Sequence, residues 1–340
     1  MNPVPTKTFV LDIGRKCSIN CLFCYYKHLG DLRRQGWISK KEIFKEINNG
    51  IKRGNNRTEL TGGEPTLHPD IEEIISYLKE KNILSCIISN ALISSDKLSS
   101  LINCGVDEFL FSVHGLETTH DFLTQCSGAR KQQGKTFCFL KEINLKNGFR
   151  FNFVINKYNQ EEIYATSVYM SQFNPTMVNF INMNPHHGWE RDKETKNIIA
   201  DLRVVEKQLN LAIEYLENLN IGVNVRYYPM CRIDEKYRRC ICNDLHVLFD
   251  DKEWDYCIES KTFLNYKKHA INMSDNIEEK GEPCCLCDLQ NICGGANKHF
   301  HKASNEVYEE VLIPHIIFNK DFDKSDFYFY RKNNVLTLSE

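Results

Sequence analysis

Residues 15–30 read RKCSINCLFCYYKHLG, and this stretch places three cysteines close together near the start of the chain. Cys17, Cys21 and Cys24 have the spacing C-x3-C-x2-C and follow directly on the apolar run TFVLDIG. A disulfide framework needs cysteines in pairs, and a closed zinc site needs four ligands. Three thiols therefore predict a metal site whose remaining ligand comes from elsewhere.

The composition favours a folded protein and disfavours several classes of function. The chain has 340 residues, 42% of them hydrophobic, which suffices for one large domain or for a large and a smaller one. Its formal net charge of -2 provides no general basic surface field, so the charge disfavours nucleic acid as a partner. The start, MNPVPTKTFV, has no apolar signal-peptide core, and no run of about 18 apolar residues could span a bilayer. We therefore expect a cytoplasmic protein with no membrane partner.

The cysteine count is high and odd. Fifteen cysteines fit poorly with a fully paired framework, and structural disulfides rarely persist in a reducing compartment. Cys86, Cys104 and Cys138 lie in apolar runs, where a cysteine usually acts as a small buried hydrophobe. Most of the others gather near the two ends of the chain, and such clusters indicate metal sites.

Strands and helices alternate from about residue 7 to residue 185. The expected strands are KTFVLDIG (7–14), RTELTGG (57–63), ILSCIISN (83–90), VDEFLFSVHG (106–115), FRFNFVINK (149–157) and TMVNFINMNP (176–185). Such alternation predicts a parallel sheet with right-handed crossovers. Six strand-helix units predict an α/β fold, a partial (β/α)6 TIM-like barrel, rather than a complete eightfold one.

The chain changes character after the sixth unit. We expect a long amphipathic helix over 197–219, an edge-like strand in IGVNVRYYP and then a small irregular cysteine-rich module. The predicted domains are the barrel at 1–196, the module with its linking helix at 197–304 and a C-terminal tail at 305–340. Inside the barrel, a helix near 135–147 follows an irregular stretch.

Two interpretations of the first triplet remain open on the residues alone. Zinc would use His28, four residues beyond Cys24, as its fourth ligand. A four-iron, four-sulfur cluster would use cysteines on three irons and leave the fourth iron open to a substrate. A loop after the first strand of a parallel barrel would face the barrel mouth, where ligands bind.

Other polar residues also follow strand ends. TGGEP (61–65) ends the second strand, and its two glycines would let the backbone approach a ligand while Glu64 offers a carboxylate to an ammonium group. The third strand ends in Ser89 and Asn90, and the fourth carries Ser112 and His114. A zinc knuckle requires none of these, so they favour the cluster.

The chain resembles a radical S-adenosylmethionine (radical SAM) enzyme in four sequence motifs: CSINCLFC, GGEP, ISN and FSVHG. The resemblance implies that Cys17, Cys21 and Cys24 ligate a 4Fe-4S cluster whose open iron holds SAM. It implies methionine-ammonium contacts by Gly62, Gly63 and Glu64, and a place near the adenine for Phe23. Ribose or carboxylate contacts are implied for Ser89, Asn90, Ser112 and Asn156. For these last four, strand-end solvation or capping explains the residue equally well.

The resemblance also implies a reaction. A reduced cluster would cleave SAM, and the resulting 5′-deoxyadenosyl radical would take a hydrogen atom from an unactivated carbon. The electron would come from a flavodoxin- or ferredoxin-type donor. His114, which points toward the mouth if the strand phase is kept, is the candidate catalytic residue, whereas the pair His186 and His187 fits a solvated loop equally well.

A second group of cysteines lies near the C-terminal end. Cys284, Cys287 and Cys293 have the spacing C-x2-C-x5-C, and with Cys231 they supply four thiolates, enough for one auxiliary iron-sulfur cluster or a zinc ion. The pattern resembles the SPASM/twitch extension of radical SAM enzymes. It departs from the full form because Asn297 stands where a further cysteine is expected. One auxiliary 4Fe-4S cluster is therefore expected. Rival ligands are Cys240, Cys242, Cys285 and, more weakly, Cys257.

The substrate is predicted from the family alone. Members with auxiliary clusters often modify ribosomally made peptides, which makes peptide maturation the first expectation. The alternative is the same chemistry on a small molecule such as a sugar or aminocyclitol, by dehydrogenation or dehydration. A non-enzymatic zinc- or SAM-binding scaffold is the third possibility, and the intact triplet and GGEP argue against it.

Overall fold

The computed structural model describes residues 8–24, 26, 36–52, 55–143, 145, 147–183, 198–242, 278–279, 282–291, 293 and 295–297. The chain forms two compact units. Within the described ranges, the first holds residues up to 152 together with 173–176, and the second holds 153–172 and the residues from 177 onward. The expected domain limits at 196 and 304 lie outside the described residues, so the division into three domains stays a prediction.

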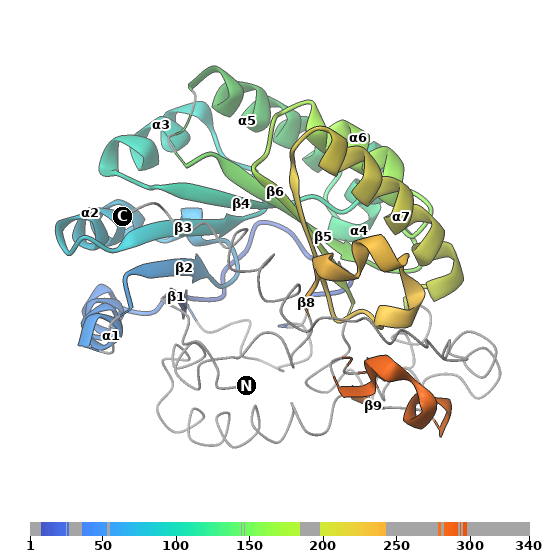
Figure 1. The fold of residues 1–340 in the computed structure, drawn as a ribbon. Coiled ribbons are helices and arrows are strands. Elements are labelled where there is room, and N and C mark those ends of the chain that lie inside the picture. The colour runs from blue at the N-terminus through green and yellow to red at the C-terminus, as the bar shows by residue number, and fades with distance from the viewer. Residues whose placement is uncertain are drawn as a thin grey trace. The chain divides into compact units, whose positions relative to one another are not determined.

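The first unit alternates strands and helices. Its elements are β1 (Thr8–Asp12), α1 (Lys40–Lys52), β2 (Arg57–Thr61), α2 (Ile71–Glu80), β3 (Leu84–Ser89), α3 (Ser95–Cys104), β4 (Glu108–Ser112), α4 (Glu117–Thr124), α5 (Ala129–Ile143) and the beginning of β5 (Phe149–Ile155). The helices α1, α2, α3 and α5 lie along one side of strands β1 to β4 (Figure 1). This arrangement leaves the other face of the sheet uncovered by them.

The second unit continues the alternation. Its elements are α6 (Ile163–Ser171), β6 (Met177–Asn182), α7 (Leu202–Asn218), β7 (Gly222–Arg226), β8 (Ile241–Cys242), β9 (Glu278–Glu279) and β10 (Ala296–Asn297). Helix α7 confirms the long amphipathic helix expected over 197–219, and Asp201 caps it by accepting a hydrogen bond from the Arg203 N–H. None of the helices in the described ranges has the length and apolar character needed to cross a bilayer.

Strands β1 to β8 form one sheet in that order, and β9 and β10 form a separate two-stranded antiparallel sheet. The registered pairs along the first of these sheets are parallel, from Thr8 opposite Arg57 to Val225 opposite Ile241. The α/β fold class with a partial TIM-like barrel is therefore confirmed. The edge-like role expected for IGVNVRYYP is wrong, because the two-residue strand β8 pairs with β7 on its outer side.

One helix boundary differs from the sequence-based expectation for a clear reason. Helix α5 begins at Ala129, not near 135, and α4 occupies part of the stretch expected to be irregular. The carboxylate of Asp121, in α4, accepts hydrogen bonds from the backbone N–H groups of Gly128 (2.5 Å) and Arg130 (2.9 Å). These bonds satisfy N–H groups at the start of α5, which have no partner inside the helix. A cap supplied by the preceding helix leaves no local signal in the sequence.

The two faces of the sheet in the first unit differ in chemistry. Phe109 and Phe111 of β4 point to the helix side, where Phe111 packs against Phe137 of α5. Residues at the alternate positions point to the opposite face, as the period of two in a strand requires. Glu108 and Arg150 occupy such positions, so the face opposite the helices carries charge.

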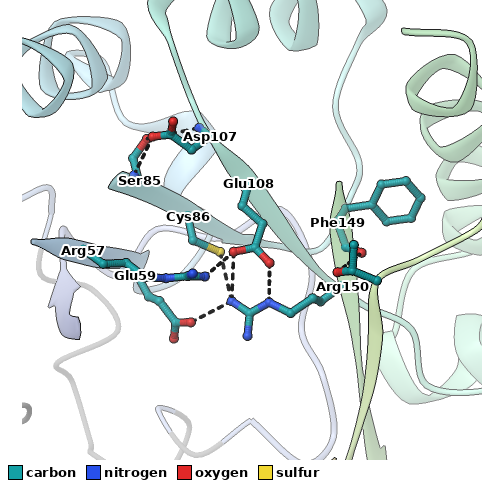
Figure 2. A network of polar contacts seen from close by, with 9 residues as sticks. Arg57, Glu59, Ser85, Cys86, Asp107, Glu108, Phe149 and Arg150 are labelled. Carbon is teal, nitrogen blue, oxygen red and sulfur yellow. Dashed lines mark hydrogen bonds and ion pairs between the residues drawn. The ribbon is translucent and has the colours of Figure 1, made fainter. Parts of the chain in front are cut away.

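That charge is organised as an ion-pair network across three strands (Figure 2). Glu108 of β4, whose side chain is 3% exposed, binds Arg57 of β2 and accepts a hydrogen bond from Arg150 Nε at 2.5 Å. Arg150 of β5 also binds Glu59 at 2.8 Å, and one of its amino groups lies 3.6 Å from the Cys86 sulfur. Ion pairing raises the pKa of Arg150 above its ordinary value, although burial opposes the shift. None of these charged residues was singled out from the sequence.

The network predicts a strong dependence of stability on Glu108. In Glu108→Gln, two arginines lose their buried anionic partner, and we expect the free energy of unfolding to fall by about 3–5 kcal/mol. The control is Glu73→Gln, which breaks the exposed pair with Lys40 and should change little. Urea denaturation of the three proteins measures the difference. Equal effects of the two variants would contradict a stabilising role for the network.

Candidate active site

The cysteine loop begins where β1 ends and is fixed to helix α4. The backbone N–H of Asn20 donates to the Thr124 carbonyl at 3.0 Å, and that of Leu22 donates to the Leu123 carbonyl at 2.8 Å. Cys17 is exposed, and Cys21 and Cys24 are half-buried. Helix α4, which the sequence did not predict, therefore holds the segment between the first and last cysteine in place.

The GGE segment after β2 packs its backbone directly against the same loop. Gly63 N–H donates to the Gly14 carbonyl and Glu64 N–H to the Lys16 carbonyl, both at 2.8 Å. A Cβ on Gly62, whose φ is +141°, would lie 2.1 Å from the Gly14 oxygen, and one on Gly63 would lie 2.2 Å from the Lys16 oxygen. Because Gly62 and Gly63 have no Cβ, the chain's own cysteine loop can pack against them, which the sequence did not predict. Contacts of these glycines with SAM stay a prediction.

Glu64 is almost fully buried, and its carboxylate accepts four hydrogen bonds. Oε1 receives Thr66 N–H (3.2 Å), the Thr66 hydroxyl (2.7 Å) and the Ser89 hydroxyl (2.9 Å), while Oε2 receives Asn90 N–H (2.7 Å). Burial raises the pKa of Glu64, and the hydrogen bonds oppose that rise. A neighbouring ammonium group would lower this pKa and favour the ionised form. Binding of the methionine ammonium by Glu64 stays a prediction.

The other strand-end residues have partners within the chain. The Ser89 hydroxyl bonds to Glu64 and accepts the Ala91 N–H, and the Ser112 carbonyl accepts the Gln133 amide. Asn156, in the second unit, is fully buried; it caps a turn by accepting the Tyr158 N–H. These contacts fit the capping explanation. Contacts with the SAM ribose or carboxylate are not tested by them.

His114 is buried beside the cysteine loop. Its ring meets Phe23 edge-to-face, with centroids 4.7 Å apart, and stacks on His120 at 5.9 Å. The His114 backbone N–H donates to Nδ1 of His120 at 3.1 Å, so that nitrogen carries no proton. Burial lowers the pKa of His114 well below its usual value and that of His120 to about 3. Both rings are therefore neutral near pH 7, and a catalytic role for His114 would have to use the neutral imidazole.

A thiolate-bound cluster fits the donors of this loop. Cys17, Cys21 and Cys24 offer soft ligands, and the Asn90 amide nitrogen lies 3.9 Å from the Cys17 sulfur, as a donor to a metal-bound thiolate would. In the described part of the chain, no three His, Cys, Asp or Glu side chains converge around a single ion. His28, the fourth ligand for zinc, lies outside the described residues.

The second cysteine group lies in the second unit. Cys231 is in a short turn of helix (Met230–Arg232) and Cys284 in another (Glu282–Leu286), and the Cys293 sulfur accepts the Gly295 N–H at 3.4 Å. Among the rival ligands, Cys240 is buried and directs its thiol to Glu217 at 3.6 Å. Cys285 is exposed and Cys242 ends β8. Auxiliary ligation by Cys231, Cys284, Cys287 and Cys293 stays a prediction. Cys257, His186, His187 and the tail at 305–340 lie outside the described residues.

Comparisons with known proteins identify a family match and several relatives of this chain. Residues 11–170 match the Radical SAM superfamily. A probable GTP 3′,8-cyclase of Sulfolobus acidocaldarius is 25% identical over 278 residues, which cover 79% of this chain and 84% of that protein. An Fe-coproporphyrin III synthase of Methanosarcina barkeri is 28% identical over 157 residues, 46% of this chain and 39% of the other.

Solved structures show the same fold. Streptococcus suis SuiB bound to S-adenosylmethionine matches with a TM-score of 0.59 and 16% identity, over 89% of this chain and 76% of that one. The enzyme anSMEcpe with bound AdoMet matches with a TM-score of 0.60 and 14% identity, over 97% and 98% of the two chains. At these identities the likeness concerns the fold.

A partial barrel with three cysteines on the loop after its first strand, and GGE packed against that loop, defines an enzyme that uses a 4Fe-4S cluster and SAM. Residues 11–170 form a radical SAM domain.

The close backbone contact at Gly63 predicts a sharp effect of a single methyl group. In Gly63→Ala the new Cβ would overlap the Lys16 carbonyl, so the cysteine loop must move. We expect reconstituted iron per chain to fall to about half or less, if one of two clusters is lost. Gly36→Ala is the control, because a Cβ there would meet nothing within 4 Å. Iron analysis and far-UV circular dichroism distinguish loss of the cluster from loss of the fold; full iron in Gly63→Ala would refute the argument.

Proposed function

We propose that Cys17, Cys21 and Cys24 hold the radical SAM cluster and that the strand ends around them bind SAM. The observation that carries this proposal is the direct hydrogen bonding of the GGE backbone to the cysteine loop. These hydrogen bonds connect, within the first unit, the segment that would ligate iron and the segment that would bind the methionine ammonium group. When bound, the reduced cluster supplies the electron that cleaves SAM to methionine and a 5′-deoxyadenosyl radical, which takes a hydrogen atom from the substrate.

The chain's own residues would position SAM. Glu64, oriented by four hydrogen-bond donors, would present its carboxylate to the ammonium group, whose charge would favour the ionised form. Phe23, held edge-on by His114, offers an apolar surface to the adenine. Because His114 and His120 are buried and neutral, they would support Phe23 without adding charge to the site.

For the substrate we propose a small polar molecule, which was the alternative in the sequence analysis. One observation supports it: the relatives that match most of this chain are named as cyclases of GTP. A ribosomally made peptide stays the second candidate.

Three further expectations complete the proposal. One auxiliary cluster in the second unit would be held by Cys231, Cys284, Cys287 and Cys293, as in SPASM/twitch modules. The electron would come from a flavodoxin- or ferredoxin-type donor. The high and odd number of cysteines supports a reducing cytoplasmic location. A purely non-enzymatic scaffold is no longer favoured, since the relatives are enzymes.

Iron content and SAM cleavage test the cluster assignment together. The triple variant Cys17/Cys21/Cys24→Ala should form no 5′-deoxyadenosine above background, and its iron should fall from about eight to about four atoms per chain if an auxiliary cluster is present. A fall from about four to none would leave the second group as zinc ligands or structure. The control is Cys104/Cys126/Cys138→Ala, which removes three thiols outside the loop. Unchanged iron in the loop variant would refute the proposal.

The substrate class is tested by what stimulates SAM cleavage. With dithionite as reductant, we expect GTP to raise 5′-deoxyadenosine formation at least about tenfold, equal to about 1.4 kcal/mol of barrier. Deuterium from a labelled substrate should appear in the 5′-deoxyadenosine. ATP, with the same triphosphate, is the control for a general effect of charge. Stimulation by a peptide and not by nucleotides or sugars would favour the second candidate.

A further inference from the structure

Asn90 connects the parts of the site more extensively than a ligand contact requires. It follows β3, is 7% exposed and uses its backbone and its side chain on different partners. Its N–H donates to Glu64 at 2.7 Å, and its carbonyl accepts the Gln133 amide at 2.8 Å. Gln133, fully buried in α5, also donates to the Ser112 carbonyl at 2.8 Å. The backbone of Asn90 is thereby fixed to the segment after β2 and to α5, and through Gln133 it is linked to the end of β4.

The orientation of the Asn90 side chain follows from its partners. Its Oδ1 accepts the Leu92 N–H at 3.0 Å, and a backbone N–H can only donate. The atom facing Leu92 must therefore be the oxygen, and the amino group must face the other way. On that side Nδ2 lies 3.1 Å from the Ser18 hydroxyl and 3.9 Å from the Cys17 sulfur. The chain thus presents a rigid donor to a cysteine of the triplet.

A donor in that position has a defined effect on an iron-sulfur cluster. Reduction adds negative charge to the cluster and its thiolates, and a hydrogen bond to a thiolate sulfur stabilises that charge. Hydrogen bonds to sulfur are among the factors that set cluster potentials. Partners of metal ligands also orient the ligands themselves. The neutral amide supplies this stabilisation without placing a cation beside Glu64.

We propose that Asn90 is a positioning residue that donates to the Cys17 thiolate and raises the reduction potential of the radical SAM cluster. The inference rests on the proposed ligation of that cluster by Cys17. It gives Asn90 a role on the cluster in place of the ribose or carboxylate contact expected from the sequence. Through its backbone N–H, the same residue holds Glu64, so the cluster ligand and the predicted ammonium ligand share one support.

Three variants of the full chain separate the contacts. Asn90→Ala removes the amide but keeps the backbone N–H on Glu64. Asn90→Asp keeps an oxygen for Leu92 N–H and replaces the donor by a second oxygen with negative charge. Ser18→Ala removes the hydroxyl and leaves the amide to Cys17. Asn103→Asp, at an exposed position on α3, is the control for the change of charge.

The measurement is the midpoint potential of the reconstituted cluster, by redox titration followed by electron paramagnetic resonance, with iron per chain determined for each protein. We expect the equilibrium constant of one-electron reduction to fall about tenfold in Asn90→Ala, or about 59 mV. It should fall further in Asn90→Asp and not fall in Ser18→Ala or Asn103→Asp.

Wild-type potentials in both Asn90 variants, at full iron content, would overturn this inference and leave the proposed function intact. An equal fall in Ser18→Ala or Asn103→Asp would also overturn it. If neither Asn90 variant took up iron, Asn90 would act in cluster assembly and the inference on the potential would be wrong. Failure of the proposed function has a different signature, since Cys17→Ala would then keep all its iron.

Discussion

The site depends on the backbone contact between the end of β2 and the loop after β1. Two N–H groups of the GGE segment donate to two carbonyls of the cysteine loop, and the absence of Cβ atoms at Gly62 and Gly63 makes that distance possible. Backbone hydrogen bonds leave no choice of rotamer, so they fix position more narrowly than side-chain contacts do. The loop that would hold iron is therefore placed by the sheet itself.

Further hydrogen bonds connect this contact to the ends of the neighbouring strands. Glu64 accepts donors from the end of β3, Asn90 ties that end to the cysteine loop, and Gln133 joins Asn90 to the last carbonyl of β4. Each step links neighbouring strand ends or the helix behind them. Residues predicted to contact SAM thus also support one another, and their loss would affect more than one contact.

The sequence predicted the elements whose signals are local. Strand-helix alternation gave the partial barrel, and the cysteine spacing with GGEP gave the family. The sequence analysis missed contacts made over long separations: Gln133 reaches Asn90 across 43 positions, and Arg150 reaches Glu59 across 91. Helix α4 was missed for a different reason: Leu116, at its N-cap, makes no side-chain capping hydrogen bond, and the cap of the following helix is supplied by Asp121 of α4. Nothing in the sequence near these residues indicates their partners.

Glu64 and Glu108 show how one sheet uses the same side chain in opposite ways. Glu108 is buried against the guanidinium groups of Arg57 and Arg150, which cancel its charge and tie three strands together. Glu64 is buried against four neutral donors, which orient its carboxylate but leave its charge uncancelled, so that burial raises its pKa. A carboxylate meant only for stability gains from a resident cation. A carboxylate held by neutral donors is instead prepared for a cation that arrives with a ligand, and the ammonium group of SAM is such a cation.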